Sequence, residues 1–152
     1  MLKDIPVLKA KRFGVYTCHE RSTLKEAAQA MDSRNISSLV VVGDEGQLRG
    51  IITRSDLVRA CYSHESLAGL TVQEFMNPEV VTIGLDGTLQ QVMELLIESH
   101  IHRVVAVREE NGKVIPMGIL SDADLVYHMV VAVLASGREW SEVEAELARR
   151  AV

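Results

Sequence analysis

The chain repeats itself once, and this repeat constrains the fold more than any other feature of the sequence. Residues of the first half recur in the second at a spacing of 65, which becomes 68 after three extra residues in the second copy. The identities in register pair Val15 with Val80, Thr17 with Thr82, Thr23 with Thr88, Leu24 with Leu89, Ile36 with Ile101, Val40 with Val105, Val42 with Val107, Gly50 with Gly118, Ile51 with Ile119, Asp56 with Asp124 and Leu57 with Leu125. The extra residues fall in REENGKVIPMG, a turn segment that tolerates changes of length. We therefore expect two copies of one supersecondary unit.

Hydrophobic periodicity predicts the order strand, helix, strand, strand, helix in each copy. Short β-branched runs, VYTC and VVTI, open the copies, and STLKEAAQAM and GTLQQVMELLIES follow with apolar residues three and four apart. SLVVVG and RVVAVR are continuous apolar strands of the kind covered on both faces. LRGIIT and PMGILS are the next strands, and they lead into the helices SDLVRACY and DADLVYHMVVAVLA. Ser22 or Thr23, and Thr88, mark where the first helix of each copy begins.

A chain of 152 residues fits one ordinary domain, or two small halves that share a core. We place the first copy at residues 8–62, a connector at 63–75 with a short helical turn over 71–75, the second copy at 76–131 and a helical extension at 132–152. Because halves of about 60 residues are marginal alone, we expect them to pack together as an α/β (α+β) fold. In the extension, Ser141 and Glu144 form a predicted capping box.

Composition and charge exclude several classes of protein. Hydrophobic residues make up 47% of the chain and charged residues 24%, which argues against disorder. The net charge of −5 makes nucleic acid an unlikely partner but permits a local basic pocket. The stretch Leu125–Ala135 is too short for a membrane span, and we interpret it as a buried helix or an oligomer interface. The N-terminal segment has no signal-peptide core, so we expect a cytoplasmic protein that does not associate with a membrane.

The sequence contains none of the common catalytic motifs. G-x-S-x-G, a Walker-type glycine loop and H-E-x-x-H are all missing. Cys18 and Cys61 lie in no metal-type or redox-type spacing, so we interpret them as buried free thiols. His100 and His102 form an H-x-H pair, but no cysteine or carboxylate evidently converges on it. We therefore expect no catalytic activity, no metal site and no required cofactor.

The most informative polar residues recur near the end of each copy, in GIITRSDL (50–57) and GILSDADL (118–125). In each segment a hydroxyl, of Thr53 or Ser121, precedes an aspartate, Asp56 or Asp124, by three residues, which places both in the first turn of a helix. N–H groups at a helix N-terminus and a nearby hydroxyl can bind a phosphate, and a carboxylate can accept hydrogen bonds from ribose hydroxyls. The simpler interpretation is capping, with the hydroxyl as N-cap and the aspartate at N3. Both copies need a cap, so the sequence leaves the two interpretations open.

With these motifs the repeat resembles the cystathionine-β-synthase (CBS) domain family, whose members occur as tandem pairs with the pattern G-apolar-apolar-[TS]-x-x-D near the end of each copy. The resemblance covers about Leu8 to Val131 and is strongest in the second copy, because the first lacks the M-x-P lead-in of Met76–Pro78. It implies two units packed sheet to sheet with pseudo-twofold symmetry, and two clefts between them. It also implies an adenosine-containing ligand in one or both clefts, and a homodimer of two such pairs.

The resemblance implies a set of site residues, position by position. The hydroxyls and ribose-binding aspartates of the family are matched by Thr53, Asp56, Ser121 and Asp124, and the position before the aspartate by Ser55 and Ala123. The residues beside the adenine are matched by Ile36, Ser37, Ile101 and His102, and the strand that lines the pocket by Val15, Tyr16, Val80 and Val81.

The two implied clefts should differ in charge. Arg103 stands where some nucleotide-binding relatives place a phosphate-facing arginine, and its counterpart in the first copy is Ser38. Pairing of Arg103 with a surface acid is the alternative. Arg54 and Asp122 are likewise opposite in sign at equivalent positions, so one cleft should accept an anion more readily than the other.

Three functions follow as hypotheses. The first is a regulatory module that binds AMP, ADP, ATP or S-adenosylmethionine between the repeats and transmits a conformational change to an unidentified effector protein or through its own assembly. The second is a ligand-free scaffold for dimerisation or protein interaction, in which the two motifs only cap helices. The third is a metal- or redox-responsive module that uses His100, His102 or a thiol.

Overall fold

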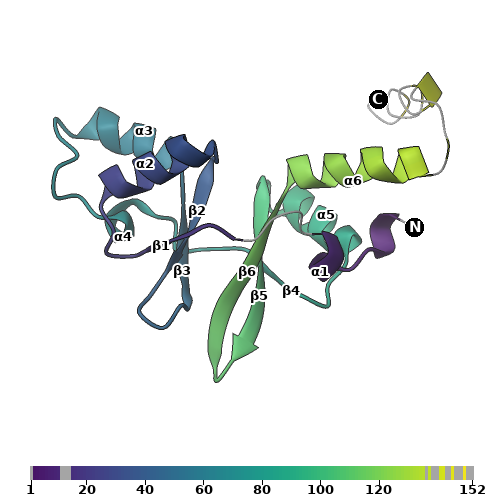
Figure 1. Cartoon of the computed structure of the whole chain (residues 1–152), viewed down its shortest axis with the longest axis horizontal. Helices are drawn as coiled ribbons and strands as arrows, with labels where there is room; N and C mark the ends of the chain where they lie inside the picture. Colours follow the sequence, from purple (N-terminus) through teal and green to yellow (C-terminus); the bar gives the residue numbers. More distant parts are fainter. Residues whose placement is uncertain are drawn as a thin grey trace.

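Two three-stranded sheets with the same topology form the centre of the molecule (Figure 1). The computed structural model describes residues 2–10 and 15–135, together with isolated positions of the C-terminal tail. The first sheet contains β1 (Thr17–His19), β2 (Ser38–Val42) and β3 (Leu48–Thr53), and the second contains β4 (Thr82–Gly84), β5 (Arg103–Glu110) and β6 (Lys113–Ser121). In each sheet the first strand pairs parallel with the second, and the second pairs antiparallel with the third. The predicted order of elements is confirmed in both halves.

The register of the sheets repeats the spacing found in the sequence. Thr17 lies opposite Val40 in the first sheet, and Thr82 lies opposite Val105 in the second. Even the irregularity of the antiparallel pairing recurs, between Val41 and Val42 in one half and between Ala106 and Val107 in the other. The repeat is therefore structural as well as sequential.

Two helices cover the outer face of each sheet (Figure 1). They are α2 (Leu24–Arg34) and α3 (Arg54–Ser63) in the first half, and α5 (Leu89–Glu98) and α6 (Asp122–Ala135) in the second. Thr23 caps α2 through its side chain, which accepts a hydrogen bond from the Glu26 N–H at 3.1 Å, and Thr88 forms the expected capping box on α5. The capping box predicted for Ser141 and Glu144 lies outside the described residues.

The inner faces of the two sheets pack against each other through a central apolar cluster. Val40, Ile51 and Val105 are its buried members, and β3 contacts β6 across it. Along β2 the neighbouring residues Leu39 and Val41 point the other way, into the first-half core under α2 and α3. This alternation explains why the sequences of β2 and β5 are continuously apolar, because each strand is covered on both faces.

The lead-in segments of the two copies are exchanged between the halves. The 3₁₀ turn η1 (Leu2–Asp4) and helix α1 (Val7–Ala10) pack on the second half, where Val7 and Ala10 are fully buried in its core. Helix α4 (Val72–Phe75), the short helical turn expected in the connector, packs in the first-half core. The backbone contacts match, since Val7 donates to the Gly87 carbonyl and Val72 to the Ser22 carbonyl, both at 2.8 Å. The two copies therefore correspond in structure also in their lead-in segments, where their sequences are not recognisably alike.

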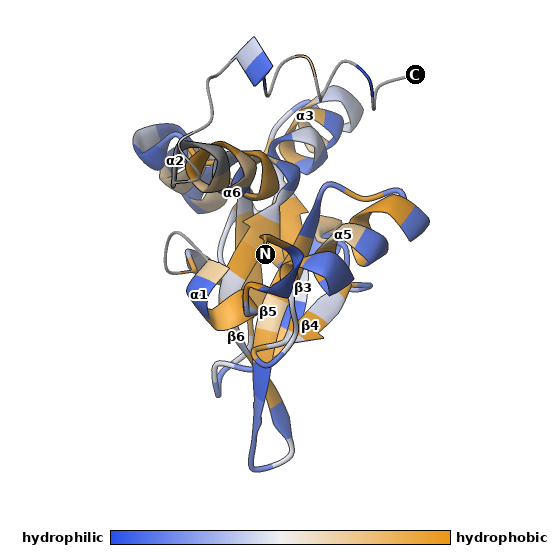
Figure 2. Cartoon of the chain, turned by 90° about the vertical axis from the view of Figure 1, so that its right-hand side faces the viewer, coloured by the Kyte–Doolittle hydropathy of each residue, from blue (hydrophilic) through white to orange (hydrophobic). Residues whose placement is uncertain are grey.

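The insertion in the second copy lengthens the hairpin of β5 and β6, which projects beyond the rest of the molecule (Figure 2). Its tip is hydrophilic in that view. Lys113 on the hairpin forms an ion pair with Glu45 in the turn between β2 and β3. The insertion thus adds a contact between the halves without disturbing either core.

Two expectations about buried residues need correction. Cys61 is exposed, because it lies on the solvent side of α3 with Val58 and Tyr62, whose exposed fractions are 68% and 93%. Cys18 is half-buried, and burial raises the pKa of its thiol to about 11. Helix α6 is also only partly buried, since Val126, Tyr127 and Val131 are exposed. The interpretation as a buried helix is therefore wrong, and the interpretation as an oligomer interface stays a prediction. None of the described helices is long and apolar enough to cross a membrane.

Candidate ligand-binding cleft

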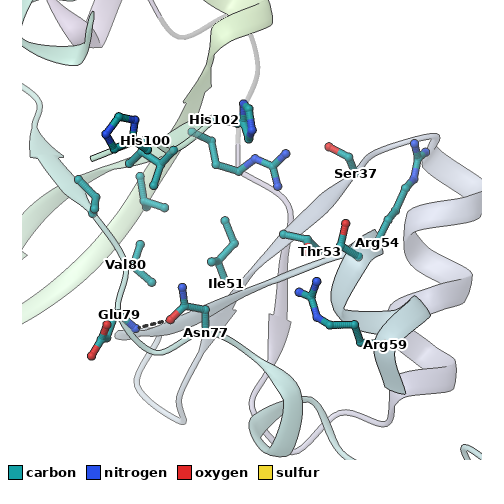
Figure 3. A pocket seen from close by; sticks show the side chains of 15 residues that line it. Ser37, Ile51, Thr53, Arg54, Arg59, Asn77, Glu79, Val80, His100 and His102 are labelled. Carbon is teal, nitrogen blue, oxygen red and sulfur yellow. Dashed lines mark hydrogen bonds between the residues drawn. The ribbon is translucent and has the colours of Figure 1, made fainter. Parts of the chain in front are cut away.

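A cleft of about 720 Å³ opens between the two halves (Figure 3). The first half lines it from the ends of β3 and α3, with Ser37, Ile51, Thr53, Arg54, Ser55 and Arg59. The segment before β4 contributes Asn77, Glu79, Val80 and Val81. The second half adds His100, Ile101, His102, Arg103 and Val105. A molecule bound here would touch both repeats.

One end of the cleft is apolar because it reaches the central cluster. Ile51 and Val105 belong to the cluster itself, and Val80 packs against it. Ile101 and Val81 are half-buried and contact the second-half core. In Figure 3 Ile51 and Val80 lie on one side of the cavity, away from the side chain of Arg59. Such a surface suits a flat, weakly polar ring.

The opposite end begins at the N-terminus of α3, where a capping box fixes the motif residues. The Asp56 carboxylate accepts hydrogen bonds from the Thr53 backbone N–H at 2.8 Å and from the Thr53 hydroxyl at 3.0 Å. The Asp56 N–H in turn donates to the Thr53 hydroxyl oxygen at 3.3 Å. Asp56 does not line the cavity and its side chain is 14% exposed. The motif residues thus cap α3, with Thr53 at the cleft wall, and ligand binding by the same residues stays a prediction.

The cleft is rich in cations although the chain as a whole is acidic. Arg54, Arg59 and Arg103 line it, whereas Glu79 is the one carboxylate among the lining residues. Arg54 donates to the Asn35 side-chain oxygen at 3.0 Å, and Arg59 pairs with Asp56 at 2.6 Å. Arg103 is half-buried and makes no ion pair with any residue that the structure describes. The expected alternative, in which Arg103 pairs with a surface acid, is not found among those residues.

His102 stands beside Arg103 and faces a carboxylate of its own half. Its Nδ1 lies 3.2 Å from the Asp122 side chain, and its carbonyl accepts a hydrogen bond from the Asp122 N–H at 3.0 Å. His100 follows the C-cap Ser99 of α5 and lies in the left-handed backbone region, with φ of 52°. Within the described ranges, no group of three or more histidine, cysteine, aspartate or glutamate side chains is placed to hold a metal ion.

The floor of the cleft explains the glycine of the first motif. Asn77 extends the free edge of β3 by two backbone hydrogen bonds with Ile51, at 2.9 and 3.0 Å. A Cβ atom on Gly50 would lie 2.8 Å from the Asn77 carbonyl oxygen and 2.7 Å from the Met76 sulfur. The Asn77 side chain is held by the Glu79 N–H at 2.9 Å (Figure 3). A side chain at position 50 would thus push the segment before β4 off the sheet.

The structure brings together only part of the site implied by the resemblance. The members in this cleft are Thr53, Ser55, Ser37, Ile101, His102, Arg103, Val80 and Val81. The members outside its lining are Asp56, Ser121, Ala123, Asp124, Ile36, Val15 and Tyr16. Ile36 packs against the first-half core, and Tyr16 lies beneath the guanidinium of Arg34 at 4.8 Å. Ser121 and Asp124 form a matching capping box on α6, with the Asp124 carboxylate 2.8 Å from the Ser121 N–H.

The sequence reasoning did not find Arg59 or Asn77. Arg59 follows Asp56 by three residues, a spacing that places both on one face of α3, so this signal was present in the sequence. Asn77 carries no such signal, because its place depends on pairing with the free edge of β3.

The repeat spacing relates every cation of this cleft to a different kind of residue in the other half. Arg54 corresponds to Asp122, Arg59 to Tyr127 and Arg103 to Ser38. The carboxylates of the two motifs correspond to each other, but Asp124 is buried. The sequence difference between the copies thus extends to three positions of this lining, and the charge of a second cleft stays a prediction.

Comparison with known proteins identifies the family. The family model of the CBS domain matches residues 3–63 and 72–131, and the chain belongs to this family. It is therefore a CBS domain pair, a class of regulatory module.

Relatives and solved structures agree with this assignment. A homoserine O-acetyltransferase from Methanococcus vannielii is 32% identical over 115 residues, which are 76% of this chain and 23% of that protein. The chain thus spans about a quarter of the length of this curated relative. The CBS domain of a membrane protein from Sphaerobacter thermophilus superposes with a TM-score of 0.69 at 26% identity, covering 83% of this chain and 88% of that one. The CBS domain pair of protein MJ0100, solved with 5′-methylthioadenosine and S-adenosyl-L-methionine, has a TM-score of 0.73 at 24% identity, covers 85% and 98% of the two chains, and shows the fold alone.

Proposed function

We propose that the chain is a regulatory module that binds an adenosine-containing small molecule in the cleft between its two CBS repeats. One observation carries the proposal: the cleft has an apolar end and a cationic end, and both repeats contribute to its lining. Its volume of about 720 Å³ lies within the usual range of small-molecule sites, about 300–1,000 Å³.

The parts of such a ligand match the two ends of the cleft. The adenine would lie against Ile51, Val80 and Ile101 at the apolar end. The ribose would lie near the N-terminus of α3, where Asp56 can accept its hydroxyls once a carboxylate oxygen is released. A phosphate would meet Arg103 and the first N–H groups of α3, which favour an anion. Thr53 and Ser55 supply hydroxyls between these regions.

The lining favours AMP, ADP or ATP over S-adenosylmethionine. Three arginines line the cavity against one glutamate, so a negatively charged ligand is stabilised and a sulfonium is not. The pair of protein MJ0100 was solved with adenosyl ligands that lack phosphate. The choice of ligand in this chain therefore rests on its own residues.

Regulation would follow from the position of the cleft between the repeats. A ligand shifts the equilibrium between two arrangements of the repeats only by the difference in its affinity for them. A ligand in this cleft would touch residues of both halves, so its affinity would depend on how they are arranged. The output surface would be the exposed apolar side chains of α3 and α6, helices that lie on the same side of the molecule (Figures 1 and 2). These side chains are Val58, Tyr62, Val126, Tyr127 and Val131. We assign them to a homodimer or to an effector protein.

A ligand-free scaffold is the second candidate function, and one observation favours it. Asp56 and Asp124 both have their carboxylates hydrogen-bonded within capping boxes, so neither needs a ligand for its hydrogen bonding. In that case the exposed apolar side chains alone would carry the function.

Calorimetric titration of the nucleotide-stripped chain with AMP, ADP, ATP and S-adenosylmethionine separates the two candidates. The sensor predicts saturable binding that is lost in Asp56→Ala and kept in Asp124→Ala. The second variant is a matched control, because it removes the same capping carboxylate from the helix that does not line this cleft. A stable dimer that binds none of the four compounds would favour the scaffold. Equal binding by both variants would show that Asp56 does not hold the ligand.

A further inference from the structure

The ion pair between Arg59 and Asp56 occupies the group that a ribose would need. Arg59 Nη2 lies 2.6 Å from Asp56 Oδ1, while Asp56 Oδ2 accepts both hydrogen bonds from Thr53. Each carboxylate oxygen therefore already has a partner in the unliganded chain. A ribose that approaches Asp56 must take the place of Arg59 or Thr53, and Thr53 is fixed by the helix cap.

Arg59 is the partner that can leave. Its side chain is 69% exposed, against 14% for Asp56, and its guanidinium lies in the cavity opposite Asn77 (Figure 3). Exposed ion pairs are weak, since a long side chain loses entropy and water competes for both charges. Arg59 lies less than two helical turns from the N-cap Thr53, so a change of its side-chain rotamer can bring the guanidinium from Asp56 toward the phosphate end without any movement of the backbone.

We propose that Arg59 makes the cleft selective for phosphorylated adenosine ligands, because it covers Asp56 in the free chain and releases it only when a phosphate replaces the carboxylate as its partner. This inference rests on the proposed function. A phosphate is a stronger partner than the Asp56 carboxylate, which gives Arg59 a single oxygen, since the phosphate offers more acceptor oxygens and more charge to the guanidinium fork. Adenosine has no phosphate that could bind Arg59. Its ribose can therefore reach Asp56 only by breaking the ion pair without forming a new one.

The residue that corresponds to Arg59 differs in the other half. Tyr127 stands at the position of Arg59, so the buried Asp124 has no guanidinium three residues along its helix. Selection by this exchange of partners is accordingly a property of the cationic cleft.

The test compares AMP with adenosine in calorimetric titrations of the full chain and two variants. In Arg59→Gln and Arg59→Tyr, AMP should bind about ten-fold more weakly, as expected for loss of a charged contact. Adenosine should bind unchanged or up to about five-fold more tightly, because the weak ion pair with Asp56 no longer has to break. The preference for AMP over adenosine should therefore fall by at least ten-fold. Arg59→Tyr imports the residue of the second copy, and thermal melts of both variants check that the fold is kept.

Arg54→Gln is the matched control, since Arg54 is a cation of the same cleft that does not touch Asp56. It should weaken AMP less and leave adenosine unchanged. An unchanged AMP-to-adenosine preference in the Arg59 variants, or an equal fall of that preference in Arg54→Gln, would overturn the inference. The proposed function would still be upheld in that case if the wild type binds AMP. Absence of binding of AMP, ADP, ATP and S-adenosylmethionine by the wild type would overturn both.

Discussion

Substitution of Gly50 by alanine tests the structural basis of the cleft floor. The added Cβ would lie 2.8 Å from the Asn77 carbonyl oxygen, which is backbone and cannot rotate away. Overpacking of this kind costs about 1–3 kcal/mol. Displacement of Asn77 would instead break its two hydrogen bonds to Ile51, worth about 1 kcal/mol each. Displacement of Asn77 removes the overpacking, so the two costs do not add. We therefore expect the free energy of unfolding to fall by about 2 kcal/mol.

Gly43→Ala provides a matched control. A Cβ there would meet the Gln47 side chain at 2.7 Å, as close as the nearest contact at Gly50, but the obstacle is the end of a flexible side chain. Rotation of Gln47 should limit the loss to about 1 kcal/mol, the value of its hydrogen bond with the Glu45 N–H. Urea unfolding followed by circular dichroism measures both variants, with the midpoint read at constant slope. If the two losses agree within about 0.5 kcal/mol, the reasoning about backbone and side-chain obstacles is wrong.

Three further predictions concern single side chains. Arg103→Ser, which imports the residue of the other copy, should weaken AMP binding by about ten-fold and leave the urea midpoint unchanged, whereas a shifted midpoint would make Arg103 structural. Val7→Ala should lower the free energy of unfolding by about 2 kcal/mol, because the Val7 side chain is fully buried in the second-half core although the residue belongs to the lead-in of the first copy. A loss of less than about 0.5 kcal/mol would contradict that packing. At pH 8 a thiol reagent should label Cys61 quickly and Cys18 slowly, because burial raises the pKa of Cys18 to about 11 and keeps it protonated; its labelling rate should climb as the pH approaches that value.

The fold could be predicted largely because its signals are local and occur twice. Hydroxyls at Thr23, Thr53 and Thr88 mark helix N-termini, and each begins its helix as expected. The apolar runs of β2 and β5 indicated strands covered on both faces, which the central cluster confirms. Cys61 was misjudged because a free cysteine is usually buried, whereas the exposed side of α3 is unusually apolar.

The composition of the cleft could be predicted only in part. Residue types near a ligand could be matched by position, but the sequence does not say which copy faces which. Thr53 of the first copy meets His102 and Arg103 of the second, and this combination depends on how the sheets pack. Asn77 enters the lining through a backbone pairing that no side-chain pattern encodes.

The exchanged lead-ins have a consequence for how such a chain can be divided or built. Cutting between the copies would leave each half without the short helix that completes its core, because α1 belongs in space to the second half and α4 to the first. Two identical single-copy chains could make the same contacts by trading their N-terminal segments, which is the geometry of domain swapping. In this chain both exchanged segments belong to one polypeptide. The two halves are therefore always present in equal number, and their association does not depend on the protein concentration.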